Sequence, residues 1–188
     1  MATNNDNRES VIDSIIDLEQ DMFTAVNNRG GESPCQQRLK TFRLMRWMTH
    51  SVHALDYLES YLKDLQAAKE AGRNLMTEKY AKMEGLIPSN VTAEISFVVD
   101  TEATWMDELK AKYPLCFSSQ GQGFKTYAAS ELQTLSPQSM ELYSKEVKDA
   151  LVAGRNLLQE RYENLYRRLG YASLDLVEQE AENKAKGE

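Results

Sequence analysis

The chain has 188 residues, with 22 Lys or Arg against 29 Asp or Glu, which gives a formal charge of −7. This length suits one domain with a sizeable core, and a net-acidic chain without a basic block argues against nucleic acid and membranes as partners. The sequence shows no apolar signal segment or membrane span and has two cysteines, Cys35 and Cys116, so we expect a reduced, cytoplasmic protein.

Apolar residues recur at helical spacing along most of the chain, and no stretch alternates as a strand does. This pattern predicts an all-α fold. After a polar tail at residues 1–8, we expect helices over 10–27, 35–53, 55–83, 90–112, 124–133 and 136–169, and a terminal amphipathic helix from 173.

One segment of the chain occurs twice. The run YLKDLQAAKEAGRNLMTEKY at 61–80 returns as YSKEVKDALVAGRNLLQERY at 143–162, and 11 of the 22 positions from Glu59 and Glu141 onward are identical. A long-range repeat of this kind predicts an internally duplicated helical bundle. We expect two three-helix units, at 9–87 and 88–172, related by a pseudo-twofold axis, followed by a terminal helix and charged tail at 173–188.

A glycine lies in the middle of each repeated helix. Gly72 and Gly154 occupy matching positions in the apolar stripe, although glycine costs roughly 1 kcal/mol against alanine inside a helix. We therefore expect a close helix–helix approach at both glycines.

Two glutamates are the strongest indication of a functional site in the sequence. Glu19 and Glu102 match in the aligned first helices of the two units, and apolar residues lie three and four positions away on both sides of each. A carboxylate buried on such a stripe needs a cation, a metal or a proton. The duplicated Arg73 and Arg155 could form structural pairs with these glutamates; alternatively, the carboxylates line a polar ligand pocket or bind a metal.

Other residues add candidates for such a pocket. Arg46 and the duplicated Tyr80 could contribute to ligand binding, and His53 could be a ligand, a general base or a hydrogen-bonded packing residue. Cys35, in the first turn of its helix, could be an activated thiol or a small buried hydrophobe. No histidine follows a glutamate by three residues, so no dimetal bundle site is predicted, and the sequence indicates no particular cofactor.

Several of these motifs occur together in a known family. The runs GGESPCQQ, FRLMRW, GRNLMTEKYAKM, WMDELKAKYP and GYASL resemble an uncharacterised bacterial domain family of unknown function, found mainly in anaerobes. The resemblance extends from about Phe23 to Leu176 and includes Trp105. The loop before Phe124 is shorter and less charged here than the family pattern. The resemblance supports one coherent domain and implies no reaction.

Two functions fit these features. The first is a small-molecule-binding protein or enzyme, with a pocket between the repeats near Glu19 and Glu102 for a small polar or cationic metabolite. The second is a non-catalytic interaction or assembly protein, acting as a homodimer or as an accessory to a larger enzyme, which the terminal amphipathic helix and acidic surface favour.

Overall fold

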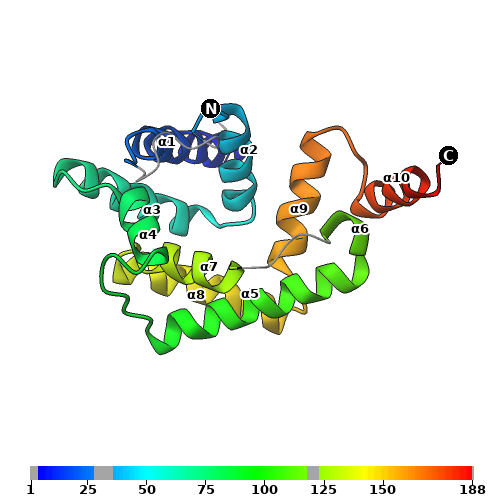
Figure 1. Ribbon diagram of the computed structural model, residues 1–188. Coiled ribbons are helices and arrows are strands. Elements are labelled where there is room, and N and C mark those ends of the chain that lie inside the picture. The colour runs from blue at the N-terminus through cyan, green and yellow to red at the C-terminus, as the bar shows by residue number, and fades with distance from the viewer. Residues whose placement is uncertain (1–3, 28–35, 118–122, 188) are drawn as a thin grey trace.

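The computed structural model describes residues 4–27, 36–117 and 123–187, which form helices joined by turns and contain no strand. The predicted all-α class is confirmed. In chain order the helices are α1 (Asn4–Thr24), α2 (Leu39–His50), α3 (Leu55–Glu70), α4 (Leu75–Met83), α5 (Ala93–Lys112), α6 (Pro114–Phe117), α7 (Phe124–Leu132), α8 (Pro137–Val152), α9 (Leu157–Arg168) and α10 (Leu174–Lys186). Figure 1 shows their arrangement. None of these helices has the length and apolar character that a membrane crossing requires.

Each of the two long repeated helices is interrupted, so the prediction of one continuous helix over 55–83, and of another over 136–169, was wrong. Gly72 and Gly154 end α3 and α8 with φ angles of +67° and +65°, a conformation that favours glycine. After Gly72, the amide of Arg73 donates to the carbonyl of Ala68 at 2.8 Å, as in a Schellman helix end.

The next helix then begins at a capping asparagine. The side chain of Asn74 accepts a hydrogen bond from the amide of Thr77 at 2.9 Å, and Asn156 caps α9 in the same way through Gln159. A Cβ added to either glycine would meet no atom within 4 Å. The expected close helix approach is therefore wrong: the glycine is needed for the turn and not for packing.

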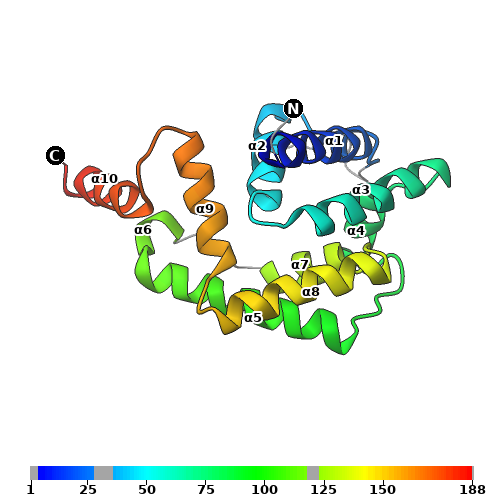
Figure 2. The same cartoon turned by 180° about the vertical axis from the view of Figure 1, so that it is seen from behind.

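Helices α1–α4 form a first half of the molecule and α5–α9 a second half, and matching pairs of helices pack in both. Helix α1 packs against α2, α3 and α4, and α5 packs against α7, α8 and α9. Across the halves, α3 contacts α8, α2 contacts α9, and α4 contacts α7. Figure 2 shows α3 above α8, and α2 and α9 facing each other. The superposition of the two halves about a pseudo-twofold axis stays a prediction.

The α3–α8 contact contains a reciprocal pair of helix caps. The carboxylate of Glu146 on α8 accepts a hydrogen bond from the amide of Ala54, just before α3, at 2.8 Å. The carboxylate of Asp64 on α3 accepts one from the amide of Ser136, just before α8, at 3.0 Å. Each helix therefore stabilises the beginning of the other, since a carboxylate at a helix N-terminus satisfies free amides and the helix dipole.

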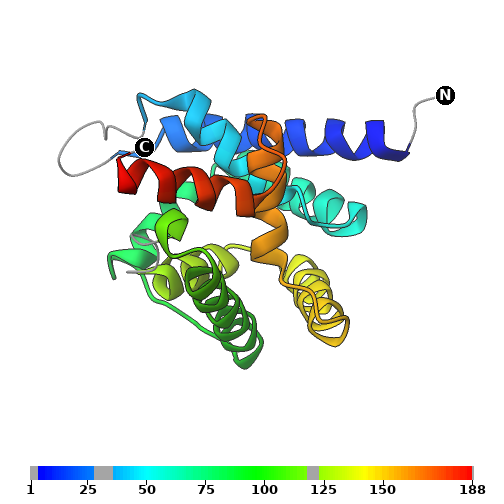
Figure 3. The ribbon, with the colours of Figure 1, turned by 90° about the vertical axis from the view of Figure 1, so that its right-hand side faces the viewer.

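The expected terminal helix is α10. It packs against α6 and α9, and its Leu174 is buried. The carboxylate of Glu178 accepts hydrogen bonds from the amides of Leu115 and Cys116 at 2.8 and 2.9 Å. In Figure 3, viewed from the side of α10, α1 lies across the top of the molecule with α5 and α8 below it. The apolar face of α10 thus covers the same chain.

Candidate functional site

Glu19 is completely buried on α1, as the apolar stripe predicted. Its carboxylate forms a two-pronged pair with Arg46 of α2, at 2.7 and 2.5 Å, and accepts a hydrogen bond from the Tyr61 hydroxyl of α3 at 2.9 Å. The Nε2 atom of His50 lies 3.2 Å from the same carboxylate. Burial alone would raise the pKa of Glu19, but Arg46 and His50 lower it to about 2. Glu19 is therefore a charged, fully partnered group.

Arg46 also reaches the second half of the molecule. Its Nη2 atom lies 2.8 Å from the carboxylate of Glu131 on α7, and the Lys79 ammonium of α4 lies 2.6 Å from that same carboxylate. Although burial opposes both charges, Glu131 and Glu19 raise the pKa of Arg46, and Arg46 and Lys79 hold the pKa of Glu131 well below its usual value. Glu19, Arg46, Glu131 and Lys79 form a line of alternating charge across the α4–α7 contact, in which Glu131 is partly exposed and the other three are buried.

Glu102 of α5 is the corresponding carboxylate in the second half and is 3% exposed. The Tyr143 hydroxyl of α8 donates to its Oε1 atom at 2.5 Å, just as Tyr61 donates to Glu19. The cation is Arg161 of α9, whose Nη2 atom donates to the Tyr143 hydroxyl at 2.8 Å and lies 3.4 Å from Glu102 Oε1. The prediction of two buried glutamates is confirmed, although Glu102 is held less tightly than Glu19.

His53 connects this group to the α3–α8 contact. It is buried, and its Nδ1 and Nε2 atoms lie 2.5 Å from Glu146 and 3.1 Å from Arg161. Arg161 can only donate, so Nε2 must be the accepting nitrogen and Nδ1 carries the proton that Glu146 accepts. Burial, reinforced by Arg161, lowers the pKa of His53 to about 4 despite Glu146. His53 is therefore a neutral, hydrogen-bonded packing residue.

The expected pairing of the glutamates with Arg73 and Arg155 was wrong. Arg73 pairs with Glu78 at 2.7 Å, and Arg155 with Glu160 at 2.6 Å, and both arginine side chains are at least half exposed. The reason is the helix break: each arginine lies in the turn between two helices, where its side chain reaches the first turn of the next helix. These pairs brace the turns and do not reach Glu19 or Glu102.

The repeat also contains the cations that sequence reasoning missed. Lys79 and Arg161 occupy matching positions and are both buried. Each follows two buried apolar residues by three and four positions, for example Leu158 and Leu157 before Arg161. This is the same signal that identified the two glutamates. Applied to cations, it would have found both residues.

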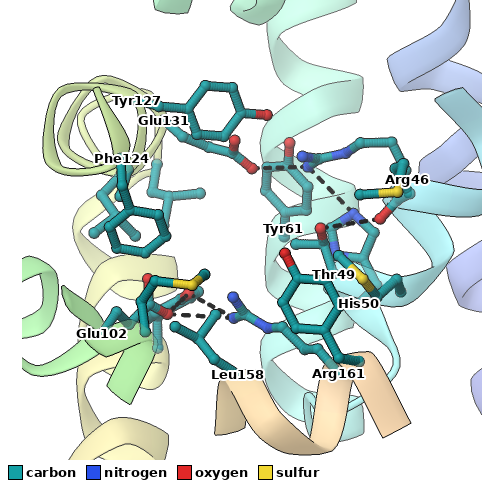
Figure 4. A pocket seen from close by; sticks show the side chains of 18 of the residues that line it. Arg46, Thr49, His50, Tyr61, Glu102, Phe124, Tyr127, Glu131, Leu158 and Arg161 are labelled. Carbon is teal, nitrogen blue, oxygen red and sulfur yellow. Dashed lines mark hydrogen bonds and ion pairs between the residues drawn. The ribbon is translucent and has the colours of Figure 1, made fainter. Parts of the chain in front are cut away.

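A cavity of about 420 Å³ lies between the halves and is lined by residues from both. Figure 4 shows the Arg46–Glu131 pair on one side of it and the Arg161–Glu102 pair on the other, with Phe124 between them. The rest of the lining is mainly aromatic and apolar, and includes Tyr57, Tyr127, Met45, Met106, Leu132 and Leu158. Glu19 lies behind this surface, covered by Arg46 and His50.

Two polar atoms of the lining residues stand out. Within the described part of the chain, His50 Nδ1 and Arg161 Nε are buried without a hydrogen-bond partner. In the same part, Tyr143 and Arg161 both approach Glu102 through Oε1, which leaves Oε2 without a hydrogen bond. His50 Nδ1 and Arg161 Nε expose almost no surface, so neither of them faces the cavity. Glu102 Oε2 and Arg161 Nη1 also form no hydrogen bond within the described ranges, and they are not among the fully buried atoms. Polar groups inside proteins are almost always satisfied, so these two atoms give the Arg161–Glu102 side of the cavity unused hydrogen-bonding capacity.

The remaining candidates do not form a reactive centre. Tyr80 is partly buried against the ring of Phe23 at 6.4 Å between ring centres, and its repeat partner Tyr162 lines the cavity. Cys35 lies outside the described residues. Within the described ranges, no group of three or more His, Cys, Asp or Glu side chains is placed to hold a metal ion. The arrangement is suited to binding a molecule in a preformed cavity.

Comparison with known proteins gives one match. A family model described as a protein of unknown function (DUF4125) matches residues 9–179. No curated protein and no solved structure matches the chain.

Proposed function

Since the chain belongs to the DUF4125 family, whose function is unknown, we propose from its own residues that it binds a small polar molecule in the cavity between α1–α4 and α5–α9. The observation that carries the proposal is the Arg161–Glu102 pair on the cavity wall, in which Arg161 Nη1 and Glu102 Oε2 form no hydrogen bond with the described residues. An unsatisfied pair of this kind is costly in a purely structural role, and a polar ligand would satisfy it.

The size and lining of the cavity support the same function. Sites for small organic molecules usually measure about 300–1,000 Å³ and combine apolar walls with a few placed polar groups. A cavity of about 420 Å³ with aromatic and methionine side chains around two ion pairs has that character. The polar groups come from α2, α5, α7 and α9, so a bound molecule would contact both halves.

Native mass spectrometry of the protein purified from its own host tests the proposal. We expect a co-purifying small molecule in the wild type and none in Ala128→Phe, because Ala128 is buried on the cavity wall and a phenyl ring there occupies the ligand's space. Thr126→Phe is the matched control, since Thr126 is exposed on the same helix and does not line this cavity.

The control should retain the co-purifying molecule. If Ala128→Phe folds normally and keeps the same bound mass as the wild type, the molecule binds elsewhere and the proposal is wrong. A wild-type protein that carries no bound molecule and is not stabilised by any compound in a metabolite screen would also contradict it.

A further inference from the structure

We infer that the cavity accepts a net-neutral, flat molecule that presents a carbonyl oxygen next to an N–H group, as a cyclic amide in an aromatic heterocycle does. This inference rests on the proposed function and specifies its ligand class. It follows from the charge balance around the cavity, the free atoms of one ion pair, and the shape of the apolar walls.

The buried charges around the cavity balance. The carboxylates of Glu19, Glu102 and Glu131 are matched by the cations of Arg46, Lys79 and Arg161. The charged side chains on the cavity wall balance as well, with Arg46 and Arg161 against Glu102 and Glu131. Glu146 lies beyond His53 and does not line the cavity; its carboxylate is held by His53 and by the amide of Ala54. A ligand with a net charge would leave an uncompensated charge in a buried site. The balance therefore favours a ligand with no net charge.

One of these pairs offers a donor beside an acceptor. Arg161 uses Nη2 for Tyr143, His53 and Glu102, and within the described ranges Nη1 donates no hydrogen bond. Nε also lacks a partner, but it is fully buried and does not face the cavity. Glu102 uses Oε1 only. A ligand carbonyl can accept from the guanidinium while a neighbouring ligand N–H donates to Glu102 Oε2. The guanidinium donor and the carboxylate acceptor are therefore complementary to the C=O and N–H groups of a cyclic amide.

A zwitterion would match the same two side chains less well. Its ammonium and carboxylate would each lose water on entering the cavity, whereas Arg161 and Glu102 already neutralise each other at 3.4 Å. An amide edge adds hydrogen bonds without breaking that pair. The pair therefore favours a neutral edge over two full charges.

The walls beside this pair favour a flat body. Phe124 and Leu158 lie on either side of the Glu102–Arg161 pair in Figure 4, and Tyr127 lies further along the same wall as Phe124. Aromatic side chains stack with flat rings at low entropic cost. A fused heteroaromatic ring can contact these residues while its amide edge faces the ion pair.

Three related probes test the inference by isothermal titration calorimetry: quinolin-2(1H)-one, its N-methyl derivative, and quinoline. The first has the carbonyl and the N–H, the second lacks the N–H, and the third lacks both. We expect the cyclic amide to bind about tenfold more tightly than either analogue, as one or two well-placed hydrogen bonds allow. L-Tryptophan serves as a zwitterionic probe.

Glu102→Gln provides a second test, because the side-chain amide has one oxygen where the carboxylate has two. With Tyr143 bound to that oxygen, an NH2 group faces the ligand N–H. The affinity for quinolin-2(1H)-one should fall about tenfold, toward that of the N-methyl derivative, whereas the affinity for quinoline should change by less than about threefold. An unchanged affinity for the cyclic amide would contradict the contact with Glu102 Oε2. Circular dichroism confirms that the variant is folded.

The outcomes separate the two proposals. If quinoline binds the wild type but not Ala128→Phe, and the cyclic amide binds no more tightly than quinoline, the cavity binds small molecules but the amide-edge inference is wrong. Preferential binding of L-tryptophan would also overturn that inference. If none of the probes binds, the inference falls, while a co-purifying molecule lost in Ala128→Phe would still support the proposed function.

Discussion

Arg46→Met should destabilise the protein far more than Arg73→Met, although both substitutions remove an arginine that pairs with glutamate. Arg46 is buried and contacts both Glu19 and Glu131. Its loss leaves the completely buried Glu19 carboxylate with only Tyr61 and His50. Removing one partner of a buried ion pair costs about 3–5 kcal/mol. Glu131 keeps Lys79 at 2.6 Å, so we expect a value near the lower end of that range.

Arg73 is the matched control because its side chain is 55% exposed and its pair with Glu78 is open to solvent. Such pairs contribute about 0–1 kcal/mol. Urea unfolding followed by the fluorescence of Trp47 and Trp105 measures both free energies of unfolding. In a chain of this size, a difference of 3 kcal/mol also lowers the melting temperature by roughly 6–12 °C.

The pH dependence of Arg46→Met identifies the cause. Without Arg46, burial should raise the pKa of Glu19 above its unfolded value, so the variant gains stability as the pH falls and Glu19 binds a proton. In the wild type, Glu19 with a pKa of about 2 contributes stability above its ordinary value of 4.5 and loses it as the pH falls toward 2. The two proteins should therefore approach each other in stability at acidic pH. A loss in Arg46→Met no larger than that in Arg73→Met would refute this account of the buried network.

Three further substitutions test the turns and the neutral histidine. In the wild type, the free energy of unfolding should fall by about 3 kcal/mol between pH 6.5 and 4, because the histidine binds a proton in the unfolded chain and not in the folded one. His53→Gln should remove this fall. An unchanged pH profile in urea titrations would contradict the neutral state of His53. Gly72→Ala should cost about 1–2 kcal/mol, because φ is +67° although no neighbour would clash; a neutral effect on thermal unfolding would argue against the helix break. Asn74→Ala should cost about 1 kcal/mol or more, since its side chain caps α4 and also donates to the carbonyl of Met22 at 2.7 Å; Asn74→Ser, which keeps a capping oxygen, should recover part of this loss in the same measurement.

The burial of Glu19 and Glu102 was predictable because helical spacing alone determines which residues share a face. Their partners were not, because Arg46 and Arg161 come from other helices, and which helices meet is decided by tertiary packing. Arg73 looked suitable only on the assumption of an unbroken helix. The feature that the sequence analysis overlooked was the local break in the backbone helix at Gly72.

The helix break at Gly72 could have been predicted from the residues around it. The apolar stripe continues past it, because α3 and α4 both bury residues such as Leu65 and Leu75, so periodicity could not distinguish one helix from two. The sequence Gly-Arg-Asn does distinguish them, since glycine favours a helix end and asparagine a helix start two residues later. By contrast, the cavity between the halves follows from side-chain packing that no spacing rule describes.

The covalent connection between the two halves has a consequence for molecular recognition. A cavity on the axis between two identical chains must present the same groups twice, so that an asymmetric ligand can bind in two equivalent orientations. The predicted repeat, with its offset of 82 residues, pairs Arg46 of α2 with Ala128 of α7, and both residues line the cavity. On this alignment, one wall carries a guanidinium where the other carries a methyl group. Joining both halves in one chain removes the degeneracy and allows the cavity to select a single orientation of its ligand.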